Sequence, residues 1–333
     1  MKKFITSTFI VALAGLAFAA EQNYFVGNYT WTSKADFEAD ISSKYNGATG
    51  GTITFNLPSE TTVANFTSDF TFESVVALTG ATTVFTSDAG TTLTFNEVSS
   101  SGTKLAIKTS GTTVLKSGDF SKMNDIYLQA PVQTTLILDG ASLKNVHTHF
   151  YNGVKILAKK DAQINLLYFR ASNVKNSFER TVGGTVAAAG CTLTVGDMAR
   201  NPGNGFLNAD FYFEFASEGA DEIIYKNSDL YTEIMTGAQS QLILKDFGFG
   251  DTLQVKENLT DAKFADKLFV ETGADDSLVR KTFAELFNAG LIKEDTTTNE
   301  GFYTYTMAIP EPAEYAVIFG VLALGLVFYR RRK

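Results

Sequence analysis

The sequence is poor in cysteine, histidine, tryptophan and proline. Its 333 residues include one cysteine, two histidines, one tryptophan and five prolines. Because Cys191 is alone, the chain cannot form an internal disulfide, and the fold must be held by packing and backbone hydrogen bonds. Cys191 alternates with Leu193 and Val195 across polar residues, which predicts a thiol buried on the apolar face of a strand. The alternative is a reactive or intermolecular thiol.

Residues that hold metals or carry catalysis are also scarce. His147 and His149 would point the same way in an extended segment, which makes them a weak candidate metal site. No third ligand follows at a suitable spacing, so we predict no metal and no cofactor. Motifs for phosphate loops, nucleophile elbows, zinc proteases and dinucleotide binding are missing from the sequence. The acidic pairs at 221–222 and 275–276 have no spacing that predicts a catalytic site.

Positive charge is in short supply as well. The chain has 28 basic and 36 acidic residues and a formal net charge of −8. Six of the basic side chains but only two of the acidic ones lie within 1–19 and 310–333, at the two ends of the chain. The segment between these ends is therefore more acidic than the whole chain. Such a surface argues against nucleic-acid binding.

The N-terminus has the three parts of a secretory signal peptide. Two lysines precede an apolar run at 4–16. Ala17 and Ala19 then place small residues at the positions that signal peptidase requires. We therefore predict that residues 1–19 form a signal that signal peptidase removes. An N-terminal anchor helix is the alternative, although the apolar run is short for a membrane span.

The C-terminus carries a second apolar segment. Residues 315–329 contain no charged residue and end at Arg330, Arg331, Arg332 and Lys333. We predict one transmembrane helix at 315–329, with this basic stop on the cytoplasmic side. At about 1.5 Å per residue the helix is about 22 Å long. Snorkelling basic side chains make up the difference from a bilayer core of about 30 Å.

A proline-containing spacer stands directly before this apolar segment. Pro310 and Pro312 flank Glu311. Two prolines one residue apart exclude helix and sheet pairing, so the spacer is extended and accessible to a processing enzyme. The order of Pro-Glu-Pro, apolar helix and basic end resembles the PEP-CTERM sorting signal of Gram-negative bacteria. The resemblance covers only 310–333, at the end of the chain.

This resemblance implies a sorting route. It implies that an exosortase recognises Pro310, Glu311 and Pro312 and cleaves near them, as happens to lipid-anchor signals whose hydrophobic tail is removed. The arginines of the basic stop match the end of the family's signal. Proteins of this kind are associated with exopolysaccharide and biofilm matrices. The alternative is a plain single-pass anchor that contains the motif by chance.

Short alternating segments fill the body of the chain. Apolar and polar residues alternate, and clusters of Gly, Ser and Asp separate the segments, which indicates β-strands and turns. We predict strands at 52–55, 82–85, 91–95, 104–108, 112–116, 125–129, 134–138, 154–157, 163–168, 191–195, 211–215 and 241–244. The apolar residues Phe85, Phe95 and Ile107 lie ten and twelve residues apart. This spacing fits a sandwich, a barrel or a solenoid.

The start of the body favours the solenoid. Residues 33–36 form a capping box, and Phe37, Ile41 and Tyr45 recur on one helical stripe. A helix at 33–45 followed by Gly-Gly and a strand resembles the N-terminal cap of pectate-lyase-like β-helices. A solenoid needs such a cap because an open first turn exposes the core and backbone donors. We predict an all-β protein, a right-handed parallel β-helix or solenoid over 20–250.

The region after the solenoid changes character. Residues 277–289 have the apolar spacing of a helix, with Asp275 and Asp276 near its N-terminal end. Phe302, Tyr303 and Tyr305 then predict a last strand. We expect residues 251–309 to cap the C-terminal end of the solenoid and residues 310–333 to form the sorting signal.

Two functions fit these features. The first is a non-enzymatic structural or adhesin-like protein. It would be anchored in the inner membrane during sorting and then held at the cell surface or in the extracellular matrix, where polysaccharide is its expected partner. The second is a carbohydrate-active β-helix enzyme held at the surface, a polysaccharide lyase or glycosidase, and it rests on fold analogy alone. Three carboxylates, or carboxylates beside Lys or Arg, in one groove would favour the enzyme.

Overall fold

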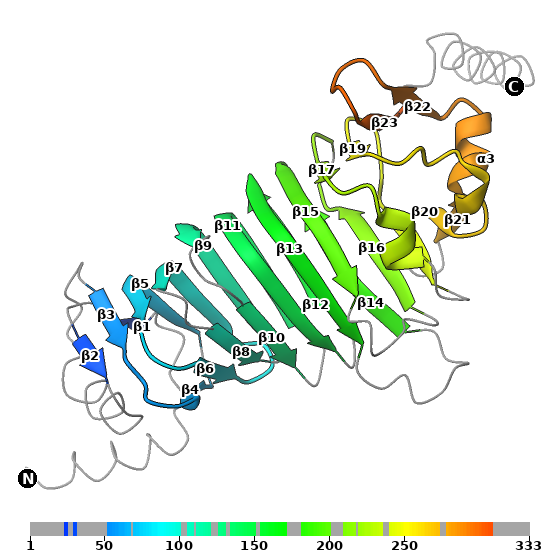
Figure 1. Cartoon of the computed structure of the whole chain (residues 1–333). Helices are drawn as coiled ribbons and strands as arrows, with labels where there is room; N and C mark the ends of the chain where they lie inside the picture. The colour runs from blue at the N-terminus through cyan, green and yellow to red at the C-terminus, as the bar shows by residue number, and fades with distance from the viewer. Residues whose placement is uncertain are drawn as a thin grey trace, which may run out of the picture.

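A computed structural model describes most of the body of the chain. The described residues are 23–25, 29–31, 52–67, 69–100, 105–109, 111–120, 126–130, 134–150, 154–171, 181–200, 209–217, 219–235, 240–273 and 278–308. Over these residues the protein is a mostly parallel β-solenoid of about seven turns (Figure 1). Strands succeed one another along a single axis, from β3 and β5 at one end to β20 and β23 at the other (Figure 1).

Strands dominate the described part of the chain. They are β1 Asn23–Phe25, β2 Tyr29–Trp31, β3 Thr52–Phe55, β4 Thr61–Phe66, β5 Phe70–Leu78, β6 Thr83–Ser87, β7 Thr92–Ser100, β8 Leu105–Thr109, β9 Thr112–Phe120, β10 Ile126–Ala130, β11 Thr134–Phe150, β12 Val154–Lys160, β13 Ala162–Ala171, β14 Thr181–Ala188, β15 Thr192–Arg200, β16 Ala209–Phe215, β17 Glu222–Tyr225, β18 Gln241–Lys245, β19 Thr252–Val255, β20 Leu268–Thr272, β21 Val279–Thr282, β22 Ile292–Asp295 and β23 Tyr303–Met307. The helical elements are a π-helical turn η1 Tyr231–Met235, a 3-10 turn η2 Ala262–Phe264 and helix α3 Phe283–Asn288.

Consecutive turns pair through three rows of parallel strand segments. The first row runs through β4, β6, β8, β10 and the C-terminal parts of β11, β13 and β15. The second row runs from β1 and β5 through β7, β9, the start of β11, β12, β14, β16 and β18 to β20. The third row includes β3 with β5 near the start, and β13, β15, β17 and β19 near the end.

The length of a turn increases along the solenoid. Near the start Val84 pairs with Ala106, whereas near the end Ile223 pairs with Leu253, which is a longer step along the chain. Phe85 and Ile107 are partners in the first row, while Phe95 lies in the second. The ten- and twelve-residue spacing therefore reflects successive rows of a solenoid rather than the strands of a sandwich.

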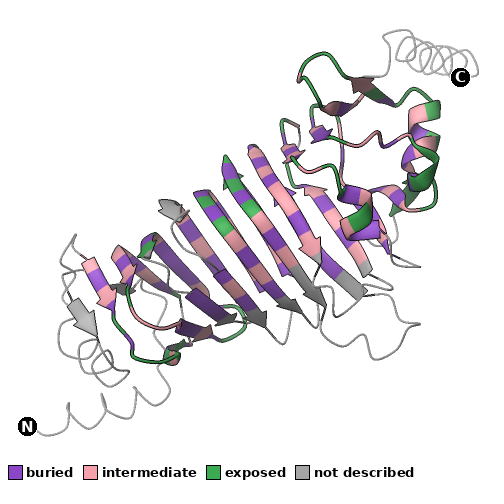
Figure 2. Cartoon of the chain, in the orientation of Figure 1, coloured by how far each residue is buried: buried purple, intermediate pink, exposed green. Residues whose placement is uncertain are grey.

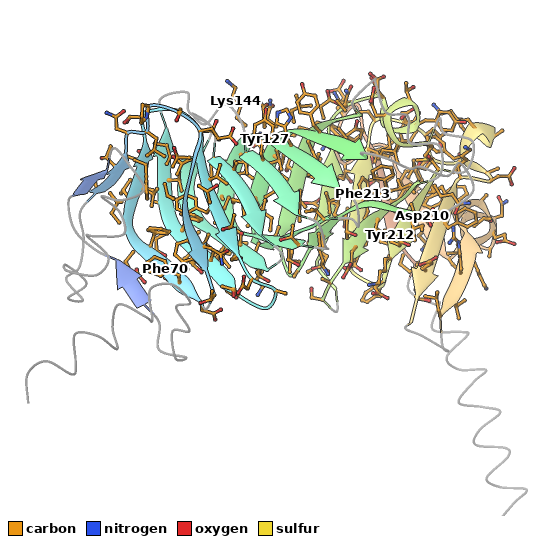
Figure 3. All side chains as sticks on the ribbon, turned by 90° about the horizontal axis from the view of Figure 1, so that it is seen from below. Phe70, Tyr127, Lys144, Asp210, Tyr212 and Phe213 are labelled. Atoms are coloured by element: carbon orange, nitrogen blue, oxygen red, sulfur yellow. The ribbon has the colours of Figure 1, made fainter. Side chains whose placement is uncertain are left out.

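The core is a set of inward-facing ladders. Phe72 pairs with Phe95, and Phe95 with Leu115, so like side chains stack from turn to turn. The rings of Phe72 and Phe95 are parallel within 10°, with centroids 5.1 Å apart. Buried and more exposed residues alternate along the strands (Figure 2), as the two-residue period of a strand requires. Phe213 is buried and its neighbour Tyr212 is half-buried on β16 (Figure 3).

Antiparallel strands close the C-terminal end. The parallel ladder continues past residue 250, because β19 and β20 pair with β17 and β18. Strand β21 then pairs antiparallel with β20, and β23 pairs antiparallel with β19 and β22. The predicted last strand is confirmed as β23. This reversal ends the parallel stack.

The predicted helix at 277–289 is shorter in the structure. Helix α3 begins at Phe283, because Val279–Thr282 forms strand β21 instead. Thr282 and Glu285 form a complete capping box at this start. Backbone pairing with β20 therefore overrides the helical spacing of the residues before Phe283. Asp275 and Asp276 lie outside the described residues, and they precede β21 rather than the helix.

Both terminal signals lie outside the described residues, and so does the expected cap helix. These segments are the predicted signal peptide 1–19, the capping helix 33–45, the spacer 310–312, the apolar segment 315–329 and the basic stop 330–333. Within the part of the chain that is described, no helix is both long enough and apolar enough to span a bilayer.

Candidate functional site

A hollow on the described surface lies at one corner of the solenoid. Its volume is about 940 Å³, and it lies where the second row turns into the third. Only three residues connect β14 to β15, but six connect β16 to β17 and six connect β18 to β19. These two longer turns surround the hollow. It is lined by Glu214, Phe215, Ala216, Ser217, Gly219, Ala220, Asp246, Gly248, Phe249, Gly250 and Asp251.

The two turns approach each other closely through glycine. Gly250 has a φ of 93°, a conformation that favours glycine. A Cβ at Gly250 would lie 3.2 Å from the Cα of Gly219. The backbone N–H of Ala220 also donates to the carbonyl of Gly250 at 3.2 Å. The turns therefore form one wall rather than two independent loops.

A fully buried carboxylate, Asp221, holds the base of this wall. It accepts hydrogen bonds from the backbone N–H of Ser217 at 2.9 Å and from the Ser217 hydroxyl at 2.6 Å. It also accepts from the backbone N–H of Gly190 in the preceding turn. Buried carboxylates need such donors, because an unpaired charge in the interior is costly. Asp221 is therefore structural.

Asp251 repeats this arrangement one turn later. Its two oxygens accept from the backbone N–H groups of Gly248 at 2.8 Å and Asp221 at 3.2 Å. Burial raises the pKa of Asp251, the two N–H groups oppose this rise, and the negative charge of Asp221 adds to it. The carboxyl group at the floor of the hollow therefore holds a proton to higher pH than a free aspartate.

Glu214 lies between two cations at the edge of the hollow. Lys155 Nζ lies 2.6 Å from Glu214 Oε1, and Lys245 Nζ lies 3.6 Å from Oε2. The Glu214 side chain is only 12 % exposed, so this network is better shielded than a surface pair. One carboxylate on β16 and two lysines, one on the adjacent strand β18 and one on β12 two strands away, thus meet on the outer face of the second row.

Asp246 and Phe249 are the accessible groups of the hollow. Asp246 adopts a left-handed φ of 56°, and its backbone N–H donates to the carbonyl of Glu271 at 2.7 Å. Its carboxylate has no hydrogen bond or ion pair with another described residue. The Phe249 side chain is 63 % exposed. Among the described residues, the hollow therefore offers one free carboxylate and one open aromatic ring.

The histidine pair is divided in the structure. His147 lies half-buried on the outer side of the first row, between Tyr127 and Tyr168, with ring centroids 4.6 and 4.4 Å away. Both tyrosines are its register partners in adjacent turns. The side chain of His149 lies outside the description. Across the described residues, no three His, Cys, Asp or Glu side chains are placed to hold a metal.

Cys191 is buried, as its alternation with apolar residues predicts. It is 8 % exposed, and its Sγ donates to the carbonyl of Ala158 at 3.3 Å. Burial raises the pKa of the thiol, with further contributions from Asp161 and Asp221 and an opposing hydrogen bond from the Ala189 backbone. Leu193 and Val195 share its buried face.

The acidic pair at 221–222 does not act as a unit. Asp221 lies inside the corner, whereas Glu222 faces outward on β17. Glu222 accepts from the Thr192 hydroxyl at 2.8 Å and the Gln254 amide at 2.6 Å. Neighbours along a strand point to opposite sides, so these two carboxylates cannot flank one substrate bond.

The residues of the hollow could not be recognised from the sequence. Glu214, Asp246, Phe249 and Asp251 carry no motif of their own. A usable signal was the recurrence of an aspartate within two residues of a glycine, at Asp221 and again at Asp251. The step between these two aspartates equals the step between register partners of β17 and β19, so it reports one turn of this part of the solenoid.

These features define a parallel β-solenoid protein with a polar hollow at one corner. Comparison with protein-family models, with curated proteins and with solved structures found no match. The function must therefore be argued from the chain's own residues.

Proposed function

We propose that the chain is an exported structural or adhesin-like protein of the cell surface or extracellular matrix. The observation that carries this proposal is the order Pro310-Glu311-Pro312, apolar segment and basic stop, which is combined with a signal-peptide pattern at the other end. A solenoid supports the proposal, because stacked turns give a long rigid surface whose stability adds from turn to turn.

Outward polar ladders suit such a surface. The Thr86 hydroxyl donates to the Asn65 side chain at 2.8 Å across one turn. In the last turns, the Gln254 amide donates to Glu222, and the Asn299 amide donates to Gln254 at 2.7 Å. Rows of hydroxyl, amide and carboxylate groups can exchange hydrogen bonds with the hydroxyls of polysaccharide.

The proposed route has three steps. Signal peptidase removes residues 1–19 after export. The segment 315–329 then holds the chain in the inner membrane, with the basic stop 330–333 in the cytoplasm. An exosortase recognises the spacer 310–312 and transfers the body to the cell surface or the exopolysaccharide of a biofilm.

A finer description of the fold belongs to the same proposal. We infer a right-handed β-helix of the pectate-lyase-like type with a capping helix at 33–45. Connections between parallel strands of one sheet are almost always right-handed, and the sequence pattern at 33–55 supports a helix that covers the first turn.

Intact-mass measurement of the form recovered from the cell surface tests the route. We expect a chain that starts at Ala20 and ends near Pro310–Pro312. A protease added outside intact cells should digest this form, and the soluble cytosolic fraction should contain none of it. A soluble cytosolic chain that keeps both Met1 and Lys333 would refute the proposal.

One observation favours the enzyme as a second candidate. Glu214, Asp246 and Asp251 line a single hollow, beside Lys155 and Lys245. Two of these carboxylates are already engaged, because Glu214 lies between the lysines and Asp251 accepts two backbone N–H groups. A glycosidase needs two carboxylates that both face the bond they cleave, so the structural role is favoured.

Incubation with polysaccharides separates the two candidates. The purified full-length protein would be incubated with neutral, amino-sugar and uronate polymers, and new reducing ends and unsaturated products would be measured. We expect neither to form. Product formation that Asp246→Asn or Glu214→Gln abolishes would replace the structural role by the enzymatic one.

A further inference from the structure

We propose that the corner hollow binds a sugar residue that carries no negative charge. The inference deepens the proposed function, on which it rests, because it names the site and the sugar class by which the solenoid contacts polysaccharide. Three features of the hollow carry it, namely its open aromatic ring, its free carboxylate and its rigid walls.

The aromatic ring of Phe249 is exposed to solvent and is not packed in the core. It stands between Gly248 and Gly250 at the tip of its turn and is 63 % exposed, whereas the rings of Phe213 and Phe215 are buried in the core. A single exposed apolar side chain is common on protein surfaces, but Phe249 also lines the hollow, beside the carboxylate of Asp246. The C–H face of a pyranose packs well on the face of a phenyl ring, which carries partial negative charge.

The carboxylate of Asp246 supplies the polar contact. It lines the same hollow, and within the described part of the chain no hydrogen bond or ion pair occupies it. Ionised carboxylates only accept hydrogen bonds, and sugar hydroxyls or an ammonium group can donate them. An aromatic ring beside such an acceptor matches the two faces of a sugar, one apolar and one polar.

The charge of the hollow selects the sugar class. Its described lining contains the three carboxylates Glu214, Asp246 and Asp251 and no basic residue. The nearby lysines Lys155 and Lys245 are paired with Glu214, and Asp251 accepts two backbone N–H groups, so the negative charge that faces a ligand is that of Asp246. Like charges repel at close range, which excludes uronates, sulfated sugars and phosphosugars.

The walls of the hollow are fixed before a ligand arrives. Asp221 and Asp251 accept four hydrogen bonds from backbone N–H groups of the two turns and their neighbours. The N–H of Ala220 also joins one turn to the other. Little conformational entropy is then lost when a sugar binds.

Titration calorimetry with three oligosaccharides of equal length tests the inference. The probes are a cello-oligosaccharide, a deacetylated chito-oligosaccharide and an oligogalacturonate, each added to the purified full-length protein. We expect saturable binding of the neutral oligomer, the amino-sugar oligomer or both, and none of the oligogalacturonate. Binding of the oligogalacturonate alone, or of no probe, would overturn the inference.

Variants locate the binding. Phe249→Ala should weaken binding about tenfold or more, equivalent to at least about 1.4 kcal/mol, without changing the thermal midpoint. Leu278→Ala, at another exposed apolar residue that does not line the hollow, is the matched control and should bind normally. Equal affinity of Phe249→Ala and the unchanged protein would place the binding elsewhere and refute the hollow.

Asp246→Asn distinguishes the two sugar sources. Asparagine tolerates the left-handed φ of this position and keeps one oxygen acceptor. It should weaken binding of the neutral oligomer, because one acceptor oxygen is lost, and it should also remove the salt-dependent part of amino-sugar binding. The location experiment is independent of the hollow. If the protein binds sugar but is found only in the cytosol, the sugar site is supported and the surface role is refuted. If it is found at the surface but binds no probe, the surface role is supported and the sugar site is refuted.

Discussion

The backbone N–H of Asp221 donates a hydrogen bond to the carboxylate of Asp251, one turn further along the solenoid. The Asp221 carboxylate in turn accepts a hydrogen bond from Gly190, in the turn before. Three consecutive turns are thus joined through side chains at one corner, where the strands themselves are interrupted. The carboxylates add to the backbone hydrogen bonds that still join these turns, and together they give the hollow a fixed shape.

Replacement of Asp221 by alanine should loosen this corner. The change removes three hydrogen bonds to a charged acceptor and leaves the donors of Gly190 and Ser217 unpaired. We expect a loss of about 2 kcal/mol or more in the free energy of opening the corner. Amide hydrogen exchange at Ser217 and Gly190 measures this free energy directly. The method does not require two-state unfolding of the whole chain, which a repeat protein need not show.

The control for this variant is Asp266→Ala, at an exposed aspartate near the C-terminal end. It should change the same exchange rates by less than about 0.5 kcal/mol. Exchange at Ser217 that is as slow in Asp221→Ala as in the unchanged protein would show that the buried carboxylate does not hold the turn.

The raised pKa of Asp251 predicts a pH dependence of known sign. The folded chain binds the proton of this carboxyl more tightly than the unfolded chain, whose value is near 3.8. The folded state is therefore favoured as pH falls through the raised pKa towards 3.8, and this gain is lost as pH rises. The unchanged protein should gain stability relative to Asp251→Asn between neutral pH and pH 4.

Denaturant midpoints of the two proteins, measured at steps between pH 7 and pH 4, check this sign. The difference between them isolates Asp251, because the other titrating groups are shared. A difference that stays constant over the range, or that moves in favour of the variant on acidification, would contradict the raised pKa.

The strands could be predicted because their signal is local. Alternation of apolar and polar residues identified β3, β8 and β10 to within a residue, since the two-residue period of a strand is visible in any short window. The spacing of Phe85, Phe95 and Ile107 fitted a sandwich, a barrel or a solenoid, and the choice of a solenoid depended on the pattern at 33–55. Their placement in two alternating rows shows that the solenoid is the one of these three that the chain adopts.

What the sequence analysis missed depends on contacts between turns. Strands β4 and β5 have irregular alternation because bulges shift their register, so the local period fails there. The helix expected from residue 277 begins at Phe283, because the residues before it pair with β20. The hollow could not be predicted for the same reason, since Glu214 and Asp246 line one hollow only after two turns have stacked.

The thiol of Cys191 should be unreactive in the folded protein. It is buried and its raised pKa leaves little thiolate at pH 8, and the thiolate is the reactive form. A thiol reagent such as DTNB should modify less than a tenth of the protein in an hour without denaturant and all of it in denaturant. Rapid labelling of the native chain would support instead the reactive or intermolecular thiol.

Arg280 on β21 should stabilise the pairing of the antiparallel C-terminal strands with the last parallel strands of the solenoid. Its guanidinium donates to Glu271 at 2.9 Å and to Gln241, and it lies 4.1 Å from the centroid of the Phe269 ring. Arg280→Ala leaves the nearly buried Glu271 without a cation, so hydrogen exchange in β20 and β21 should speed up by the equivalent of about 1–3 kcal/mol.

Two further variants test the geometry of this contact. Arg280→Lys keeps the charge but cannot bridge two acceptors while it stacks on a ring, so it should fall between the alanine variant and the unchanged protein. Lys281→Ala, at the next and exposed residue, should have little effect. An equal effect of Arg280→Ala and Lys281→Ala would mean that the loss of one positive charge matters, and that the specific contacts of Arg280 do not.

Phe95 should be the most sensitive position of the N-terminal turns. Its ring stacks on Phe72 in the preceding turn and meets Phe85 edge-on at 5.3 Å, and all three rings are fully buried. Phe95→Ala leaves a cavity that the stacked turns cannot close, with an expected cost of about 3–5 kcal/mol.

Phe95→Leu fills part of the volume and keeps the protein measurable if the alanine variant does not fold. Thermal midpoints should fall in the order unchanged, leucine, alanine, while Phe249→Ala at the exposed ring stays at the unchanged value. Equal midpoints for Phe95→Ala and Phe249→Ala would show that the inward ladder does not hold these turns together.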